Sequence, residues 1–312
     1  MKTIHEAIKA FLFHCRYEKK LSTKTLKAYE LDCRQFLSFL VSNKLPKQLS
    51  EIDKHSIKSY LHHLKDVKPK TLRRKVATLK AMFNFLEFED EILINPFRKM
   101  KIQIKEPRTL PRVMTLGEVS SILNHAKGKV RSMKMNKSSV PYKEHVRNEA
   151  LLELMFATGM RVSEVCNLRM EDIDLKSGQV RIMGKGSRQR IIQVCHESVL
   201  NSLSTYQNLS LTRANRTKHF FLNRRKSKLS EQSVRIMISK YSKKAGIDKH
   251  ITPHTFRHSF ATLLLEQDVD IKYIQQFLGH SSINTTQIYT HVNANKQKEI
   301  LSTKHPRLAI EV

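Results

Sequence analysis

A stretch without helical periodicity, residues 99–112, divides the chain into two parts with different patterns. It contains Lys-Glu-Pro and Leu-Pro-Arg, and Asn95-Pro96 shortly before it should end the preceding helix, because the residue before a proline avoids helical geometry. We therefore predict a helical domain over residues 1–98, an extended linker over 99–112 and a second domain over 113–312. With 312 residues, the chain is long enough for each domain to have a core of its own.

The first domain shows apolar residues at helical spacing. One run follows Ser22 and Thr23, and a second follows Pro69 and continues to Leu86. The second run also carries a group of cations that either lie along a nucleic-acid backbone or merely keep the helix soluble: Lys70, Arg73, Arg74, Lys75 and Lys80.

The second domain mixes helices with a short hairpin. A capping box, Thr115-Leu-Gly-Glu118, opens it, a Lys/Ser-rich loop is expected over 128–143, and a buried helix should end at Thr158-Gly159. Two alternating runs, 180–183 and 190–194, flank a glycine-rich tip and predict a β-hairpin. Residues 220–222 are a candidate further strand, and helices are expected over 230–245, 255–267, 271–278 and 282–290. The predicted fold class is mainly α with a small β-sheet.

Charge points to a nucleic-acid partner. The formal net charge is +29 and the sequence pI is about 10.1, with the excess of Lys and Arg spread over both parts of the chain. No long apolar segment or signal peptide is evident, which disfavours a membrane partner. The four cysteines are widely spaced and form no metal-type pair, so we expect a reducing cytoplasm, with the protein near the chromosome: Cys15, Cys33, Cys166 and Cys195.

Two arginines stand in contexts that suit phosphate binding. Arg161 follows the glycine that ends the buried helix, and Arg257 lies in His254-Thr-Phe-Arg257. Two planar guanidinium groups can hold the nonbridging oxygens of one phosphate and stabilise the charge that grows in the transition state. The ordinary alternative for Arg161 is an ion pair with Glu164. We expect Glu164 to orient Arg161, which combines both interpretations.

Four further residues could move protons or attack. Lys185 at the hairpin tip could protonate a leaving oxygen or be a plain turn lysine, and the full G-x-x-x-x-G-K-[ST] pattern of nucleotide hydrolysis is absent. His254 and His258 have a zinc-type spacing, but the glutamate of H-E-x-x-H is missing and Arg257 disfavours a cation, so we expect no metal and a His258 packed inside its helix. His280 and Tyr289 could each be an ordinary structural residue. Tyr289 would need nearby cations to act as a nucleophile, because an unperturbed tyrosine has a pKa near 10.

In these motifs the chain resembles the tyrosine recombinases of the phage-integrase family. The resemblance rests on Ala157-Thr-Gly-Met-Arg161-Val-Ser-Glu164, on Thr252-Pro-His254-Thr-Phe-Arg257-His258 and on Leu278-Gly-His280 through Tyr289-Thr-His. The ending, with His305-Pro-Arg307, is similar to the compact Xer-type members. The resemblance implies a helical core-binding (SAM-like) domain and a mixed α+β catalytic domain that form a C-shaped clamp on DNA.

The resemblance also implies the chemistry. Arg161 and Arg257 would form the arginine clamp, and Lys185 would protonate the 5′ oxygen. His254 and His280 would be the active-site histidines, and Tyr289 would form a 3′-phosphotyrosyl link. No metal, ATP or other cofactor would be needed, because the link conserves the phosphodiester energy.

The implied partners are DNA and further recombinase copies. Four protomers would act on two inverted-repeat sites through a Holliday junction, a second recombinase being a possible partner, and residues 292–312 would pack into a neighbouring protomer. An integrase of a mobile element and a Xer-type resolvase both fit, the long 128–143 stretch favouring the former. The alternatives are a type IB topoisomerase and a DNA-binding accessory protein without catalysis.

Overall fold

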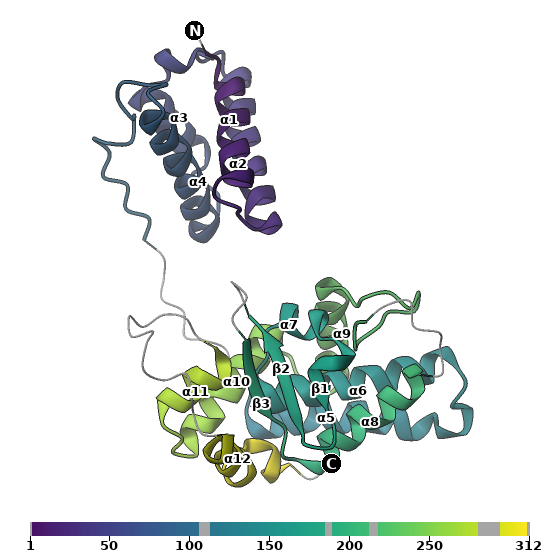
Figure 1. Ribbon diagram of the computed structural model, residues 1–312. Coiled ribbons are helices and arrows are strands. Elements are labelled where there is room, and N and C mark those ends of the chain that lie inside the picture. The colour runs from purple at the N-terminus through teal and green to yellow at the C-terminus, as the bar shows by residue number, and fades with distance from the viewer. Residues whose placement is uncertain (1, 106–112, 185–188, 212–217, 280–293, 311–312) are drawn as a thin grey trace. The chain divides into compact units, whose positions relative to one another are not determined.

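The computed structural model describes residues 2–105, 113–184, 189–211, 218–279 and 294–310. The chain forms two compact units, Met1–Thr109 and Leu110–Val312, each with its own hydrophobic core (Figure 1). The predicted fold class, mainly α with a small sheet, is confirmed. None of the helices in the described residues is both long enough and apolar enough to span a lipid bilayer.

The first unit is a group of four helices. These are α1 (Ile4–Tyr17), α2 (Thr23–Ser42), α3 (Lys54–His63) and α4 (Pro69–Phe88), with a 3-10 turn at Leu49–Glu51. The cap of α2 is Ser22, whose hydroxyl accepts a hydrogen bond from the Thr25 N–H, and Pro69 stands in the first turn of α4, where its missing N–H costs nothing. Helix α2 packs against α1, α3 and α4 around buried aromatic rings, among them Phe36, Tyr60 and Phe83.

Helix α4 ends seven residues earlier than the Asn95-Pro96 signal predicted. Its last residue is Phe88, and Asp90 then adopts a left-handed conformation with φ of 55°. The Glu91 N–H turns back to the Leu86 carbonyl oxygen at 2.9 Å, which closes the end of the helix. Pro96 therefore lies in the loop after α4 and does not end the helix.

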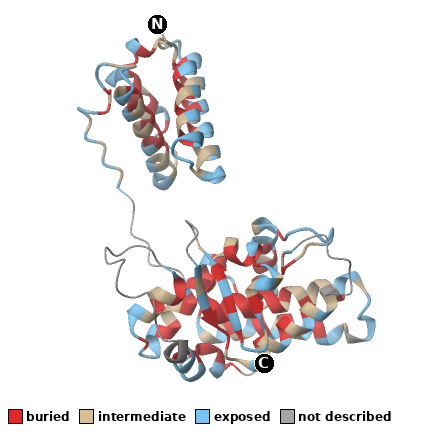
Figure 2. Ribbon diagram, viewed as in Figure 1, coloured by how far each residue is buried: buried red, intermediate tan, exposed pale blue. Residues whose placement is uncertain are grey.

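The second unit surrounds one central helix. Helix α6 (Val140–Thr158) is buried along its second half and packs against α5 (Leu116–Ser132), α8 (Glu197–Leu211) and α10 (Pro253–Glu266). In Figure 2 the buried residues concentrate on α6 and on the strands beside it. The remaining helices are α7 (Val162–Asn167), α9 (Glu231–Lys244), α11 (Ile271–Leu278) and α12 (Ala294–Thr303), with short 3-10 turns at Lys134–Asn136, Met170–Asp172 and Pro306–Ala309.

The sheet has three antiparallel strands in the order β1-β2-β3. They are β1 (Ile173–Asp174), β2 (Gln179–Met183) and β3 (Gln189–Gln193). The predicted hairpin is therefore confirmed, while the two-residue strand β1 was not predicted. The candidate strand over 220–222 is wrong: Phe220 and Phe221 are core residues, and only single bridges form nearby, at His219 and Leu222.

The loop predicted over 128–143 is too long, because the connection between the two helices spans only residues 133–139 and includes the 3-10 turn Lys134–Asn136. Helix α5 continues to Ser132 because Val130 still lies on its buried face, and α6 already begins at Val140. Ser139 caps α6, accepting a hydrogen bond from the Tyr142 N–H. The lysines and serines of this stretch lie both on the two helix ends and in the short connection between them.

In the single chain, residues 294–310 pack against their own unit. Ile300, Leu301 and Ile310 join its core, and the Gln297 side chain bonds the backbone of β3. Arg307 is 1% exposed and forms a two-pronged ion pair with Glu153 at 2.8 and 3.0 Å. This is the segment that was expected to enter a neighbouring protomer.

Candidate active site

The site is built where α6 ends. Gly159 is the C-cap of α6 and has a left-handed backbone conformation, with φ of 58°. Arg161 follows as the N-cap of α7. A Cβ on residue 159 would lie 2.6 Å from Cδ1 of Phe260 and 2.8 Å from Cδ2 of Leu278. The chain therefore passes close beneath α10 and α11 at this point, which a side chain would prevent.

Arg257 reaches the same place from α10. Its Nη1 donates to the Gly159 carbonyl oxygen at 2.8 Å, and its Nη2 donates to the Leu278 carbonyl oxygen at 2.7 Å. Burial, and then the nearby charge of Arg161, lower the pKa of Arg257 to about 10. The group remains a cation at neutral pH, and two of its five N–H donors are used by these bonds to the described part of the chain.

Arg161 is held by Glu164, as predicted, and Glu164 is shared with Arg190. Arg161 Nη1 lies 2.8 Å from Glu164 Oε1, while Arg190 donates to both carboxylate oxygens at 3.0 and 2.8 Å. Burial raises the pKa of Glu164, but the hydrogen bonds and charge of Arg190 and the hydrogen bonds of Arg161 outweigh it and lower the pKa overall. Glu164 is therefore an ionised carboxylate between two guanidinium groups.

Three arginines converge on the last turn of α11. Arg190 Nε donates to the Phe277 carbonyl oxygen at 2.9 Å, and Arg161 Nη2 donates to that of Gly279 at 3.3 Å. With the bond from Arg257 to Leu278, three consecutive carbonyls each accept from a different arginine. Cations are favoured there because the carbonyls at a helix C-terminus carry partial negative charge. The residues just before His280 are thus held among the cations of the site.

Sequence reasoning missed Arg190. Its signal was alternation: in β3 it shares a face with Ile192, and in the hairpin register it stands opposite the buried Ile182. An arginine on the inward face of a strand needs an anion or carbonyls to meet it.

The two histidines of α10 both lie on the surface. His254 and His258 are exposed, whereas Ser259 and Phe260 take the inward positions. The prediction that His258 packs inside is therefore wrong. Among the described residues, no three His, Cys, Asp or Glu side chains come together as possible metal ligands. Lys185, His280 and Tyr289 lie outside the described residues.

The cations predicted on α4 separate into two groups. Lys75 is 6% exposed and its ammonium contacts Asp32 and Gln35, so the expectation that it lies along a DNA backbone is wrong. Asp32 is fully buried and also accepts hydrogen bonds from Arg74 and Thr78. The cations that face outward are Lys70 and Arg73, with Arg74 half-buried and Lys80 over the ring of Phe97.

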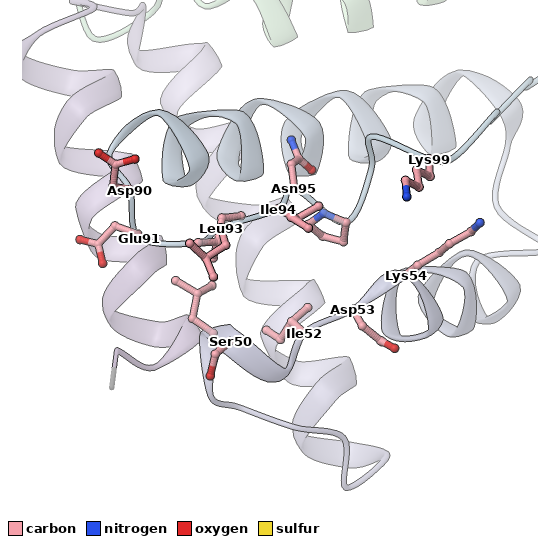
Figure 3. A pocket seen from close by; sticks show the side chains of 13 residues that line it. Ser50, Ile52, Asp53, Lys54, Asp90, Glu91, Leu93, Ile94, Asn95 and Lys99 are labelled. Atoms are coloured by element: carbon pink, nitrogen blue, oxygen red, sulfur yellow. The ribbon is translucent and has the colours of Figure 1, made fainter.

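The first unit also contains a pocket, shown in Figure 3. Asp53 and Lys54 lie on one side of it, and Asp90, Glu91 and Leu93 lie on the other. Asp53 caps α3 and Glu91 pairs with Lys2, so two of its acidic groups already have structural partners. All the residues that line this pocket belong to the first unit.

A helical unit, followed by a mainly α unit with an arginine cluster suited to a phosphodiester, fits an enzyme that breaks and rejoins DNA. Comparison with known families agrees. Residues 112–296 match the phage integrase family, and residues 8–90 match the phage integrase N-terminal SAM-like domain. The chain belongs to the phage integrase family of tyrosine recombinases.

The relatives are similar over nearly the whole chain. A tyrosine recombinase of Agathobacter rectalis is 44% identical over 308 residues, which cover 98% of each chain. Tyrosine recombinase XerD of Halalkalibacterium halodurans is 35% identical, over 98% of this chain and 100% of the relative. These relatives do not favour a type IB topoisomerase or a DNA-binding accessory protein.

Solved structures share the fold. XerH recombinase bound to its difH substrate in a pre-cleavage complex has a TM-score of 0.70 at 22% identity, covering 93% of this chain and 83% of that one. A lambda integrase dimer bound to a COC′ core site has a TM-score of 0.66 at 19% identity, covering 93% of this chain and all of the other.

Proposed function

We propose that the chain cleaves double-stranded DNA at a specific site through a 3′-phosphotyrosyl intermediate at Tyr289, and that strand exchange passes through a Holliday junction. The observation that carries the proposal is the pair of guanidinium groups, Arg161 and Arg257, at the end of α6. Arg257 is held by two carbonyl oxygens and Arg161 by Glu164. Such preorganised cations stabilise the charge that develops on the phosphate oxygens.

Each motif residue then has a role in one displacement. Tyr289 Oη attacks phosphorus, the bond from phosphorus to the 5′ oxygen breaks, and Lys185 gives that oxygen a proton. One of the two histidines, His254 or His280, accepts the proton that Tyr289 loses when it attacks. In the reverse direction a 5′ hydroxyl of the partner strand attacks the phosphotyrosyl phosphorus and gives its proton to Lys185. The bond from phosphorus to Tyr289 Oη then breaks, and the protonated histidine returns a proton to Tyr289. The number of phosphodiester bonds is unchanged, so no cofactor or metal is required.

DNA is held by both units in this proposal. The outward cations of α4, Lys70 and Arg73, with Arg74 and Lys80 beside them, bind backbone phosphates. A net charge of +29 supports capture of a polyanion from either unit. The same substrate would place the protein in the cytoplasm with the nucleoid.

Assembly is proposed to involve four copies on two inverted-repeat sites, with a second recombinase as a possible replacement for some copies. The C-terminal segment would then move from its own unit to a neighbour. Arg307 would exchange its own Glu153 for the Glu153 of the next copy, and the ion pair seen in the single chain would be remade. The relatives named XerD favour a Xer-type resolvase over a mobile-element integrase.

The test is covalent capture of DNA. The protein is incubated with sheared DNA from its own source and denatured, and the DNA that stays attached is sequenced, with Tyr289→Phe as the control. We expect one short inverted-repeat site that disappears in the variant. A chromosomal site outside any mobile element would favour the resolvase, and a site at an element's end would favour the integrase. Wild-type protein that binds DNA but leaves none attached would contradict the proposal.

A further inference from the structure

We propose that Arg190 is a positioning residue of the cleavage step, which takes up the charge of Glu164 and leaves that of Arg161 to the scissile phosphate. The inference rests on the proposed function, because it assigns Arg161 to the phosphate. It concerns a residue outside the six-residue set, on the strand that follows the hairpin tip.

Glu164 is a buried carboxylate, with a side chain 5% exposed, and a carboxylate paired with Arg161 alone would cancel the charge of that arginine. Arg190 instead makes a two-pronged contact with the same carboxylate, at 3.0 and 2.8 Å. Two cations and one anion leave one positive charge in surplus.

Exposure indicates where the surplus acts. The Arg190 side chain is 14% exposed, and its Nε, Nη1 and Nη2 all bond protein oxygens. The Arg161 side chain is 37% exposed. A phosphate that enters from solvent therefore meets Arg161, while Arg190 stays behind it as the counter-charge for Glu164.

Arg190 also links three segments. It extends from β3, just after Lys185, and it bonds both Glu164 in α7 and the Phe277 carbonyl oxygen at the end of α11. A Cβ on residue 279 would lie 3.1 Å from both Cδ and Nη1 of Arg190, so the arginine packs directly against Gly279. The side chain thus joins the strand after Lys185 to the segment before His280.

The test measures cleavage and binding separately. A synthetic duplex carrying the site recovered by covalent capture is used to follow single-turnover formation of the covalent complex and equilibrium binding. For Arg190→Gln we expect a loss of cleavage rate of about 100-fold, because Glu164 would then neutralise Arg161, and the loss of one charge-stabilising donor typically has this effect. DNA affinity should stay within about threefold, because most phosphate contacts lie elsewhere.

The matched control is Arg224→Gln. Arg224 makes the same two-pronged contact with a glutamate, to Glu144 at 2.6 and 2.7 Å, but near the start of α6. That is about 20 Å from the end of the helix at 1.5 Å per residue. We expect the control to cleave at the wild-type rate.

A charge-restoring variant separates positioning from mere stability. In Glu164→Gln/Arg190→Gln the anion and its counter-charge are both removed, so Arg161 keeps its charge. We expect this double variant to cleave at least about tenfold faster than Arg190→Gln, on the same electrostatic scale. A duplex with an uncharged methylphosphonate at the scissile position should also reduce the ratio between the cleavage rates of the wild type and Arg190→Gln. The reaction of this duplex develops less negative charge for the arginines to stabilise.

The outcomes are distinguishable. Wild-type protein that forms no Tyr289-dependent complex would overturn the proposed function and this inference with it. An active wild type with Arg190→Gln as fast as Arg224→Gln would overturn the inference alone. So would a double variant no faster than Arg190→Gln, since that result would mean that Arg190 only supports folding.

Discussion

At the scale of single residues, two left-handed glycines allow the arginine cluster to form. Gly159 ends α6 and Gly279 ends α11, with φ of 58° and 63°. The carbonyl of Gly159 anchors Arg257, and that of Gly279 accepts from Arg161. Tight helix ends thus expose the carbonyls that orient the guanidinium groups.

We predict that Gly159→Ala is clearly more destabilising than Gly246→Ala. Both positions are left-handed, so alanine costs about 1–2 kcal/mol of backbone strain at each. Only at residue 159 would the new Cβ meet other atoms, 2.6 Å from Phe260 Cδ1, whereas nothing lies within 4 Å of one at residue 246. Overpacking adds about 1–3 kcal/mol. Urea unfolding of the two variants measures the difference, and equal losses would contradict this account of the helix end.

Sequence reasoning reached Arg161, Glu164 and Arg257 because each lies in a short local motif. It missed Arg190 and misplaced His258 and Lys75, because their environments depend on strand register and on how a helix is turned in the folded unit. Lys75 is the clearest case: its interior position follows from Asp32, which is distant in sequence and fully buried. Lys185, His280 and Tyr289 remain predictions.

At the scale of elements, helix α4 combines a structural cation with outward ones. We predict that Lys75→Met lowers the free energy of unfolding by about 1–3 kcal/mol, since it removes one partner of a buried carboxylate. Its DNA affinity should not change. Lys70→Gln should leave stability unchanged and reduce the slope of log affinity against log salt by about 1. Urea unfolding of both variants measures the stability, and salt titrations of DNA binding measure the slope. A reduced slope of log affinity against log salt in Lys75→Met would show that the buried lysine contacts DNA.

The C-terminal segment should be sensitive to acid through His305. Its Nε2 lies 3.1 Å from the Ala157 carbonyl oxygen, and burial lowers its pKa to about 4 although that hydrogen bond opposes the shift. Between pH 6.5 and 4 the His305 imidazole is protonated in the unfolded chain but stays neutral in the folded protein. The free energy of unfolding therefore falls as the pH is lowered. The full loss is about 3 kcal/mol, at about 1.36 kcal/mol per pKa unit.

The matched variant for this prediction is His305→Gln, which cannot titrate. Unfolding measured at pH 7 and pH 4.5 should show a smaller acid loss in the variant than in the wild type. Other histidines of the same unit contribute equally to both proteins, so the difference reports His305. If the free energy of unfolding decreased equally in the two proteins between pH 7 and pH 4.5, the assignment of His305 as a buried, neutral group would be wrong.

The boundaries of helices and strands were harder to predict than their types. The hairpin and helices α9, α10 and α11 were predicted to within two residues at each boundary. The 128–143 loop and the end of α4 were not, because Lys/Ser composition and an Asn-Pro pair are weaker determinants than the buried face of α5 and the turn at Asp90.

For the whole molecule, the relevant observation is that the C-terminal segment packs against its own unit in the single chain. We therefore predict a monomer of 36.4 kDa without DNA. On a duplex with one recovered site we expect two copies, and four once two duplexes pair. Mass photometry with crosslinking distinguishes these species. One copy per duplex under all conditions, with relaxation of a supercoiled plasmid, would instead support the topoisomerase alternative.

The most direct test of the account is the identity of the residue that carries DNA. Captured complexes are digested with nuclease and protease, and the peptide that bears a nucleotide is sequenced by mass spectrometry. We predict a single adduct, a 3′-linked nucleotide on Tyr289. An adduct on another tyrosine or on a serine, with Tyr289→Phe still active, would contradict the account.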